Sequence, residues 1–144
     1  MKEETAFELT PNRGVGPFLF GEQIATYVND NLVEADGEPY VLGGDLHQSF
    51  VLCGRKSIIR IRCDYLQKIE SIDCYESLWF GGSNLIGRKL YEFAKLTGHE
   101  VDVDDEDIEL DGNAFRTAFN DELGVQLWVL NNAIHSVCCF DGNE

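Results

Sequence analysis

The densest group of side chains that could do chemistry in this chain is a run of acids between residues 100 and 111. Carboxylates are preferred ligands of calcium, and calcium loops space their acids strictly around a glycine. That spacing is absent here. A loop beginning at Asp102 places Asp107 where glycine is required, and a loop beginning at Asp107 reaches Ala118 where glutamate is required. We therefore expect no metal at this run.

Two other interpretations of the acidic run are compatible with each other. Apolar residues alternate with the acids, so the run can be a solvated edge strand and turn, whose charge opposes strand-to-strand aggregation. It can also be a docking face for a Lys/Arg-rich surface, because complementary charge raises the rate and specificity of association. The acids that we expect to bind such a partner are Asp102, Asp104, Asp105, Glu106, Asp107, Glu109 and Asp111.

No pattern in the sequence predicts a catalytic site, a metal site or a cofactor. His47, His99 and His135 have no metal-ligand spacing among themselves or with the cysteines. The glycine segments at residues 13–17 and 81–83 lack the spacings of phosphate-binding loops. An enzyme built on a Cys–His pair that forms only in space is the remaining catalytic hypothesis. We favour it less, because most of the cysteines lie in strand-like patterns.

The net charge of −15 is distributed unevenly along the chain. Residues 1–97 contain 14 acids and 10 bases, whereas residues 98–144 contain 12 acids and a single base, Arg116. Phosphates would be repelled by such a chain, so nucleic acid and anionic membranes are excluded as expected partners. A basic protein is the partner class that this charge favours.

The five cysteines and the hydropathy pattern indicate a cytosolic protein. The cysteine number is odd and no Cys-x-x-Cys pair occurs, as is usual in a reducing compartment. No apolar segment approaches the length needed to span a membrane, and no export signal is visible.

Similar patterns recur in the two parts of the chain. Residues 16–24 are echoed by residues 77–85, at an offset of about 60, and the strand patterns at 59–63 and 69–75 are echoed at 125–129 and 134–140, at an offset of about 65. We predict a single α+β domain over residues 1–144. It would consist of two tandem strand-helix-antiparallel-strand repeats, about 7–76 and 77–144, in one compact pseudo-symmetric domain. Whether the halves form one sheet, and whether the chain oligomerises, is left open.

Each half is expected to contain one helix followed by short strands. Apolar residues at helical spacing predict a helix from Glu22 to about Leu32, and a second that starts at Ser83 or Asn84 and stops at Gly98. Period-two alternation between turn residues predicts antiparallel hairpins, with turns at Gly43-Gly44, Asp111-Gly112 and Asn131-Asn132 among others. The strands are expected at 40–42, 49–53, 58–63, 68–75, 108–110, 114–119, 125–130 and 133–140.

The paired strands suggest which side chains point inward. Ile59 and Ile61 match Val125 and Leu127, which marks the buried face. The alternate positions carry arginine in the first half but Gln126 and Trp128 in the second. Trp128 is therefore either an exposed aromatic or covered by a helix, and Trp128 and Trp79 are the candidate aromatic anchors for a partner.

The segment from Gly14 to Gly21, Gly-Val-Gly-Pro-Phe-Leu-Phe-Gly, precedes a short amphipathic helix and hairpins. This opening, with the size and acidity of the chain, resembles small bacterial immunity-type proteins, the cytosolic antidotes of polymorphic or contact-dependent growth-inhibition toxins. The resemblance implies a non-enzymatic inhibitor that occludes the active site of a basic toxin domain, often a nuclease. The alternative hypothesis is a small-ligand or metal-binding domain that uses the cleft between the two halves.

Overall fold

The protein is mostly β, as the computed structural model, which describes residues 7–143, shows. Strands account for 51% of the chain and helices for 10%, with two helices in the described part. The predicted α+β class, with its strand-helix-antiparallel-strand repeats, is therefore wrong. The prediction overestimated the helices, which are a six-residue and an eight-residue element beside one large antiparallel sheet.

Ten of the strands form one antiparallel sheet. Its order is β11-β13-β14-β15-β8-β7-β6-β4, with β12 paired to β13 and β5 paired to β6. These strands are β4 (Val33–Ala35), β5 (Tyr40–Leu42), β6 (Asp45–Leu52), β7 (Arg55–Cys63), β8 (Ile69–Cys74), β11 (Asp102–Val103), β12 (Ile108–Leu110), β13 (Asn113–Asn120), β14 (Val125–Leu130) and β15 (Ala133–Phe140). The pairing of β15 with β8 joins the strands of the two halves into this sheet.

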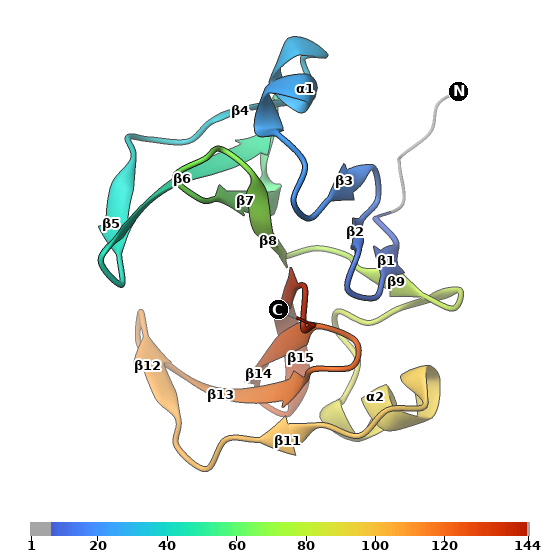
Figure 1. Cartoon of the computed structure of the whole chain (residues 1–144). Helices are drawn as coiled ribbons and strands as arrows, with labels where there is room; N and C mark the ends of the chain where they lie inside the picture. The colour runs from blue at the N-terminus through green and yellow to red at the C-terminus, as the bar shows by residue number, and fades with distance from the viewer. Residues whose placement is uncertain (1–6, 144) are drawn as a thin grey trace.

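Two small sheets and two short helices lie on one face of the large sheet (Figure 1). They are β1 (Leu9–Thr10), β2 (Gly14–Val15), β3 (Phe18–Leu19), α1 (Ile24–Asn29), β9 (Trp79–Phe80), β10 (Ser83–Asn84) and α2 (Leu90–Thr97). The large sheet turns its apolar side chains toward them. Ile59, Ile61, Val125 and Leu127 are fully buried there, which confirms the inward face predicted from the alternation.

Both helices begin later than predicted, and in each half a glycine with a left-handed backbone angle precedes the helix. Gly21 and Gly87 have φ values of +87° and +92°, in the left-handed region that only glycine enters freely. In each half this glycine donates its N–H to a strand residue, Gly21 to the carbonyl of Ile69 at 2.8 Å and Gly87 to that of Ile134 at 2.7 Å. The equivalent glycines are thus 66 residues apart, and the predicted echo of residues 16–24 at 77–85 was misaligned.

The opposite face of the large sheet is concave. In Figure 1 the sheet follows an open arc whose two ends are the β5–β6 and β12–β13 hairpins, on the side away from β1–β3. We call this surface the concave face. Its centre is formed by the alternate, non-core side chains of β7, β8, β15 and β14.

The end of the chain is tied to the first small sheet around Gly124. Asn12 donates its side-chain N–H to the Glu122 carbonyl at 2.7 Å and accepts the Gly142 N–H at 2.6 Å. A Cβ at Gly124 would overlap the carbonyl oxygen of Phe140 and lie 2.6 Å from Asn12 Oδ1. Gly124 is therefore required for close packing as well as for its φ of +74°.

We expect Gly124→Ala to destabilise the protein more than Gly54→Ala, as measured by urea unfolding. Gly54 has a φ of +75° but an added Cβ there would meet nothing within 4 Å, so both variants share a left-handed strain of about 1–2 kcal/mol. Gly124→Ala adds overpacking of roughly 1–3 kcal/mol. Equal losses in the two variants would contradict this packing.

Candidate functional site

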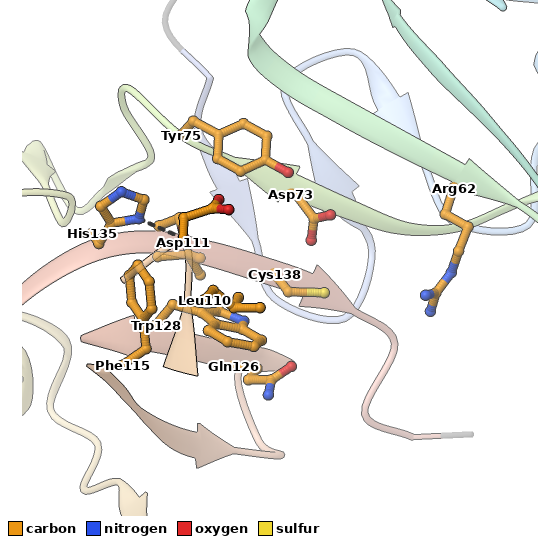
Figure 2. Close-up of a pocket in the computed structure, with 12 residues that line it drawn as sticks. Arg62, Asp73, Tyr75, Leu110, Asp111, Phe115, Gln126, Trp128, His135 and Cys138 are labelled. Carbon is orange, nitrogen blue, oxygen red and sulfur yellow. Dashed lines mark hydrogen bonds between the residues drawn. The ribbon is translucent and has the colours of Figure 1, made fainter. Parts of the chain in front are cut away.

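A pocket of about 460 Å³ opens on the concave face between strands of both halves. The N-terminal half contributes side chains of β7, of β8 and of the residue after β8, and the C-terminal half contributes side chains of β13, β14, β15, β12 and the turn after β12 (Figure 2). The principal lining residues are Arg62, Asp73, Tyr75, Leu110, Asp111, Phe115, Gln126, Trp128, His135 and Cys138.

The register of the sheet places the floor of the pocket. Asp73 on β8 lies opposite Arg60 on β7 and Cys138 on β15, and Cys138 lies opposite Gln126 on β14. Directly opposite residues in antiparallel strands point to the same side of the sheet. One row of side chains therefore crosses four strands, with Asp73 near its centre.

Asp73 is a carboxylate held in the floor without an ion pair of its own among residues 7–143. Burial raises its pKa above the usual 3.8, and hydrogen bonds with Cys138 and Tyr75, together with the positive charges of Arg62 and Arg60, oppose that rise. Because burial is the largest of these effects, the ionised form of Asp73 carries a free-energy cost.

The two arginines beside Asp73 are bound to other acids. Arg60 pairs with Asp36 at 2.9 Å. Arg62 Nε donates to Glu70 Oε2 at 2.9 Å, and the same carboxylate oxygen lies 2.5 Å from His47 Nδ1. Figure 2 shows Arg62 on the far side of Asp73 from the aromatic residues.

Aromatic rings form the wall opposite Asp73. The Phe115 and Trp128 rings meet edge to face with centroids 6.0 Å apart, and Phe115 also packs against the His135 ring at 5.1 Å. Trp128 is half-buried, so neither predicted alternative is correct. It is neither on an open face nor beneath a helix, because the β12–β13 hairpin bends over it and brings Leu110 and Asp111 to the same pocket.

The acidic run becomes β11, a turn and β12, with all its acids exposed, in agreement with the edge-strand interpretation. Two of them stabilise the segment itself: Asp104 Oδ1 accepts the Glu106 N–H at 3.2 Å, and Asp107 pairs with Arg116 at 3.1 Å. Asp111 lines the pocket. Asp102, Asp105 and Glu109 have no side-chain hydrogen bond or ion pair within the described chain.

The structure brings some predicted binding residues together and separates others. Asp111 and Trp128 share the pocket, whereas Trp79 lies in β9, in the small sheets on the opposite side of the large sheet (Figure 1). Asp111 and Trp128 are the pocket residues that were predicted to bind; Asp73, Tyr75 and Phe115 are among the others that line the pocket and were not predicted. Asp73 could have been found by extending the outward alternation of Arg60 and Arg62 to the next strand.

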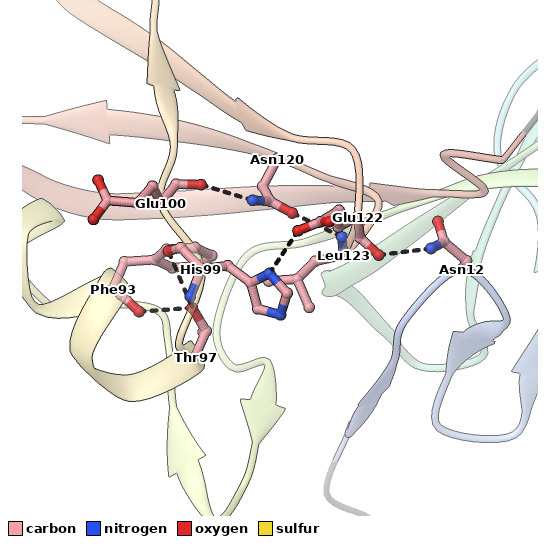
Figure 3. Close-up of polar contacts among 8 residues, drawn as sticks. All are labelled: Asn12, Phe93, Thr97, His99, Glu100, Asn120, Glu122 and Leu123. Atoms are coloured by element: carbon pink, nitrogen blue, oxygen red, sulfur yellow. Dashed lines mark hydrogen bonds and ion pairs between the residues drawn. The ribbon is translucent and has the colours of Figure 1, made fainter.

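A second polar cluster lies at the end of α2 (Figure 3). His99 Nδ1 contacts Glu122 at 3.2 Å, and Asn120 donates to the Glu100 carbonyl at 2.6 Å while its oxygen accepts the Leu123 N–H. Its hydrogen bonds close the loop between α2 and β11 against the β13–β14 turn. Because these contacts connect two loops of the backbone, we assign this cluster a structural role.

Thiol chemistry is disfavoured by the surroundings of three of the cysteines, Cys63, Cys138 and Cys139. Burial raises the pKa of Cys63 to about 12 and also raises that of Cys138, and a hydrogen bond with Cys74 together with burial raises that of Cys139. The thiolate is the reactive form of cysteine, so these side chains are weak nucleophiles at neutral pH. Within residues 7–143, no three His, Cys, Asp or Glu side chains are grouped to hold a metal, and no helix is long and apolar enough to cross a membrane.

No protein-family model, curated protein or solved structure matches the chain. The pocket on the concave face is consequently the feature from which a function can be inferred.

We expect Asp73→Asn to be more stable than the natural protein at pH 7, by a margin that shrinks toward pH 3.5. The pKa of Asp73 in the folded protein is above its usual value, so the folded protein binds this proton more tightly than the unfolded chain does. The contribution of Asp73 to the free energy of unfolding therefore falls as the pH rises from 3.5 to 7. Urea unfolding at the two pH values measures the margin, with Asp121→Asn, an exposed loop residue, as control. A variant less stable than the natural protein at pH 7 would contradict this assignment.

Proposed function

We propose that the chain is a non-enzymatic binding protein whose concave face takes up a basic segment of a partner protein. The observation that carries this proposal is an aromatic-lined pocket with an unpaired carboxylate, Asp73, bordered by an exposed acidic hairpin. Asp111 belongs to both the pocket and the hairpin. A basic segment of the partner that binds along the acidic hairpin would therefore also reach the pocket.

The electrostatics of the free protein support a cationic partner. The net charge is −15, so basic surfaces are attracted over long distances and their association is accelerated. Burial raises the pKa of Asp73, which means that its ionised form is disfavoured, and a cation that binds beside it would offset that cost. Side chains that reduce the stability of the free protein are expected where binding or catalysis needs them.

Within this class, we propose that the partner is a toxin domain and that the chain is its cytosolic immunity protein. This part rests on the resemblance of residues 14–21 and on the acidity of the chain. In the structure those residues form β2, β3 and the following turn, where Val15 and Phe18 are buried in the core. The segment builds the fold, and the binding surface is on the other side of the large sheet.

A second function is favoured by the pocket itself. Its volume of about 460 Å³ falls within the usual range for small-molecule sites, and residues of both halves line it, as the hypothesis of a ligand cleft between the halves requires. A thermal-shift screen with metabolites distinguishes the two functions. Strong stabilisation by one metabolite, without a protein partner, would favour a small-ligand protein over an antidote.

We expect the triple reversal Asp105→Lys, Glu106→Lys and Glu109→Lys to abolish protection against the toxin that we expect a neighbouring reading frame to encode. These side chains are exposed and accept no hydrogen bond in the described structure, whereas Asp104 and Asp107 are left intact because they stabilise the hairpin. The association rate constant should fall by roughly tenfold or more, since rim charges act mainly on association. Co-expression survival and surface plasmon resonance measure the two effects.

The matched control is Glu8→Lys, Glu22→Lys and Asp30→Lys, which changes the net charge equally. These three acids are also exposed, on the elements at the opposite side of the large sheet. The control should protect as the natural chain does. Equal loss in both triple variants would show that net charge alone matters, and full protection by the hairpin variant would refute this interface.

A further inference from the structure

We propose that the pocket on the concave face holds one alkyl guanidinium or alkyl ammonium group, with arginine as the best fit. This deepens the proposed function and rests on it in one respect: the carrier of the cation is a side chain of the basic partner. The pocket would then bind the anchoring side chain of the partner, and the acidic hairpin would accelerate association with it.

On the floor of the pocket, Asp73 is the carboxylate beside which a cation can bind. Arg60 and Arg62 are each within 2.9 Å of a carboxylate other than Asp73. Asp73 is contacted instead by the neutral Cys138 and Tyr75 side chains. A cation beside Asp73 would therefore complete an ion pair without breaking an existing one.

The walls match the faces of a planar cation. Trp128, Phe115 and Tyr75 present aromatic surface around the cavity (Figure 2), and cations bind over such faces, arginine more often than lysine. Asp111 enters from the β12–β13 turn, above the aromatic wall. A guanidinium has five N–H donors in a fixed plane, so it can reach carboxylates on two sides, whereas an ammonium acts as a point charge.

An anionic ligand fits the same pocket less well. The cation that an anion would need, Arg62, is held by Glu70, whose carboxylate also contacts His47. The anion would have to displace that carboxylate and would lie near Asp73 and Asp111. Both requirements are unfavourable, because like charges repel and the abandoned acid would lose its partner.

The two indole N–H signals of the natural protein provide the test. We expect N-acetylarginine methyl ester, titrated at pH 7.5, to shift the ¹H–¹⁵N signal of Trp128 and leave that of Trp79 in place, with Trp79→Phe used to assign them. The neutral isostere N-acetylcitrulline methyl ester and the anionic N-acetylaspartate should leave both signals unchanged. Trp79 is the internal control, because it belongs to β9, which lies on the opposite side of the large sheet (Figure 1).

Asp73→Asn keeps the shape of the side chain and removes its charge. It should weaken binding of the arginine ester about tenfold, in line with the loss of one charge-assisted hydrogen bond, while Asp121→Asn leaves affinity unchanged. No shift of Trp128, or an equal response to arginine and citrulline esters, would overturn the proposal. A stronger response to N-acetylaspartate would overturn it in favour of an anion site.

The two proposals fail in distinguishable ways. If Asp73→Asn binds the toxin as tightly as the natural chain, the anchor is wrong and the acidic docking face still stands. If the arginine ester binds in an Asp73-dependent manner but no toxin is bound, the cation site stands and its ligand is a free small cation. In that case the proposed antidote function is refuted.

Discussion

The pairing of β8 with β15 is the constraint on which the rest of the structure depends. It joins the strands of the two halves into one sheet, and its register sets Cys138 opposite Asp73 and Val137 opposite Cys74. Because successive strand residues point to opposite faces, a slip by one residue would exchange the two faces. Asp73 would enter the core, and Cys74, fully buried, would leave it. The same pairing therefore secures the core and builds the pocket.

The concave face places an unpaired carboxylate, Asp73, beside two arginines that are paired with other acids, an arrangement that a purely structural surface does not require. Arg60 and Arg62 are neutralised by Asp36 and Glu70, which come from the β4–β5 connection and from β8. Asp73 lies between the arginines and the aromatic wall and has neither a full ion pair nor full hydration. Stability alone would favour a neutral residue there, so binding gives the better physical reason for the carboxylate.

Local patterns predicted most strands of the large sheet and several turns, but not β4 or the short strands β1, β2 and β10. The turns at Gly43-Gly44, Asp111-Gly112 and Asn131-Asn132 all occur with left-handed backbone angles, since few other residues tolerate them. Helices were predicted less well. The apolar spacing after Ser83 resembles a helix, but Gly87 takes a left-handed angle and delays α2 to Leu90. Gly87 lies 66 residues after Gly21, and matching these two glycines in the sequence would have aligned the two halves correctly.

The sequence by itself determined most strands of the large sheet, several turns and the inward face of Ile59, Ile61, Val125 and Leu127, because alternation and turn preference are local properties of the chain. It also determined the excess of negative charge and its concentration after residue 97. Only the tertiary structure decided which acids matter at the pocket. Asp73 and Asp111 are 38 positions apart in the chain, and strand pairing and the bend of the β12–β13 hairpin bring them to the same pocket. The environment of a carboxylate depends on its neighbours in space, and no local pattern contains them.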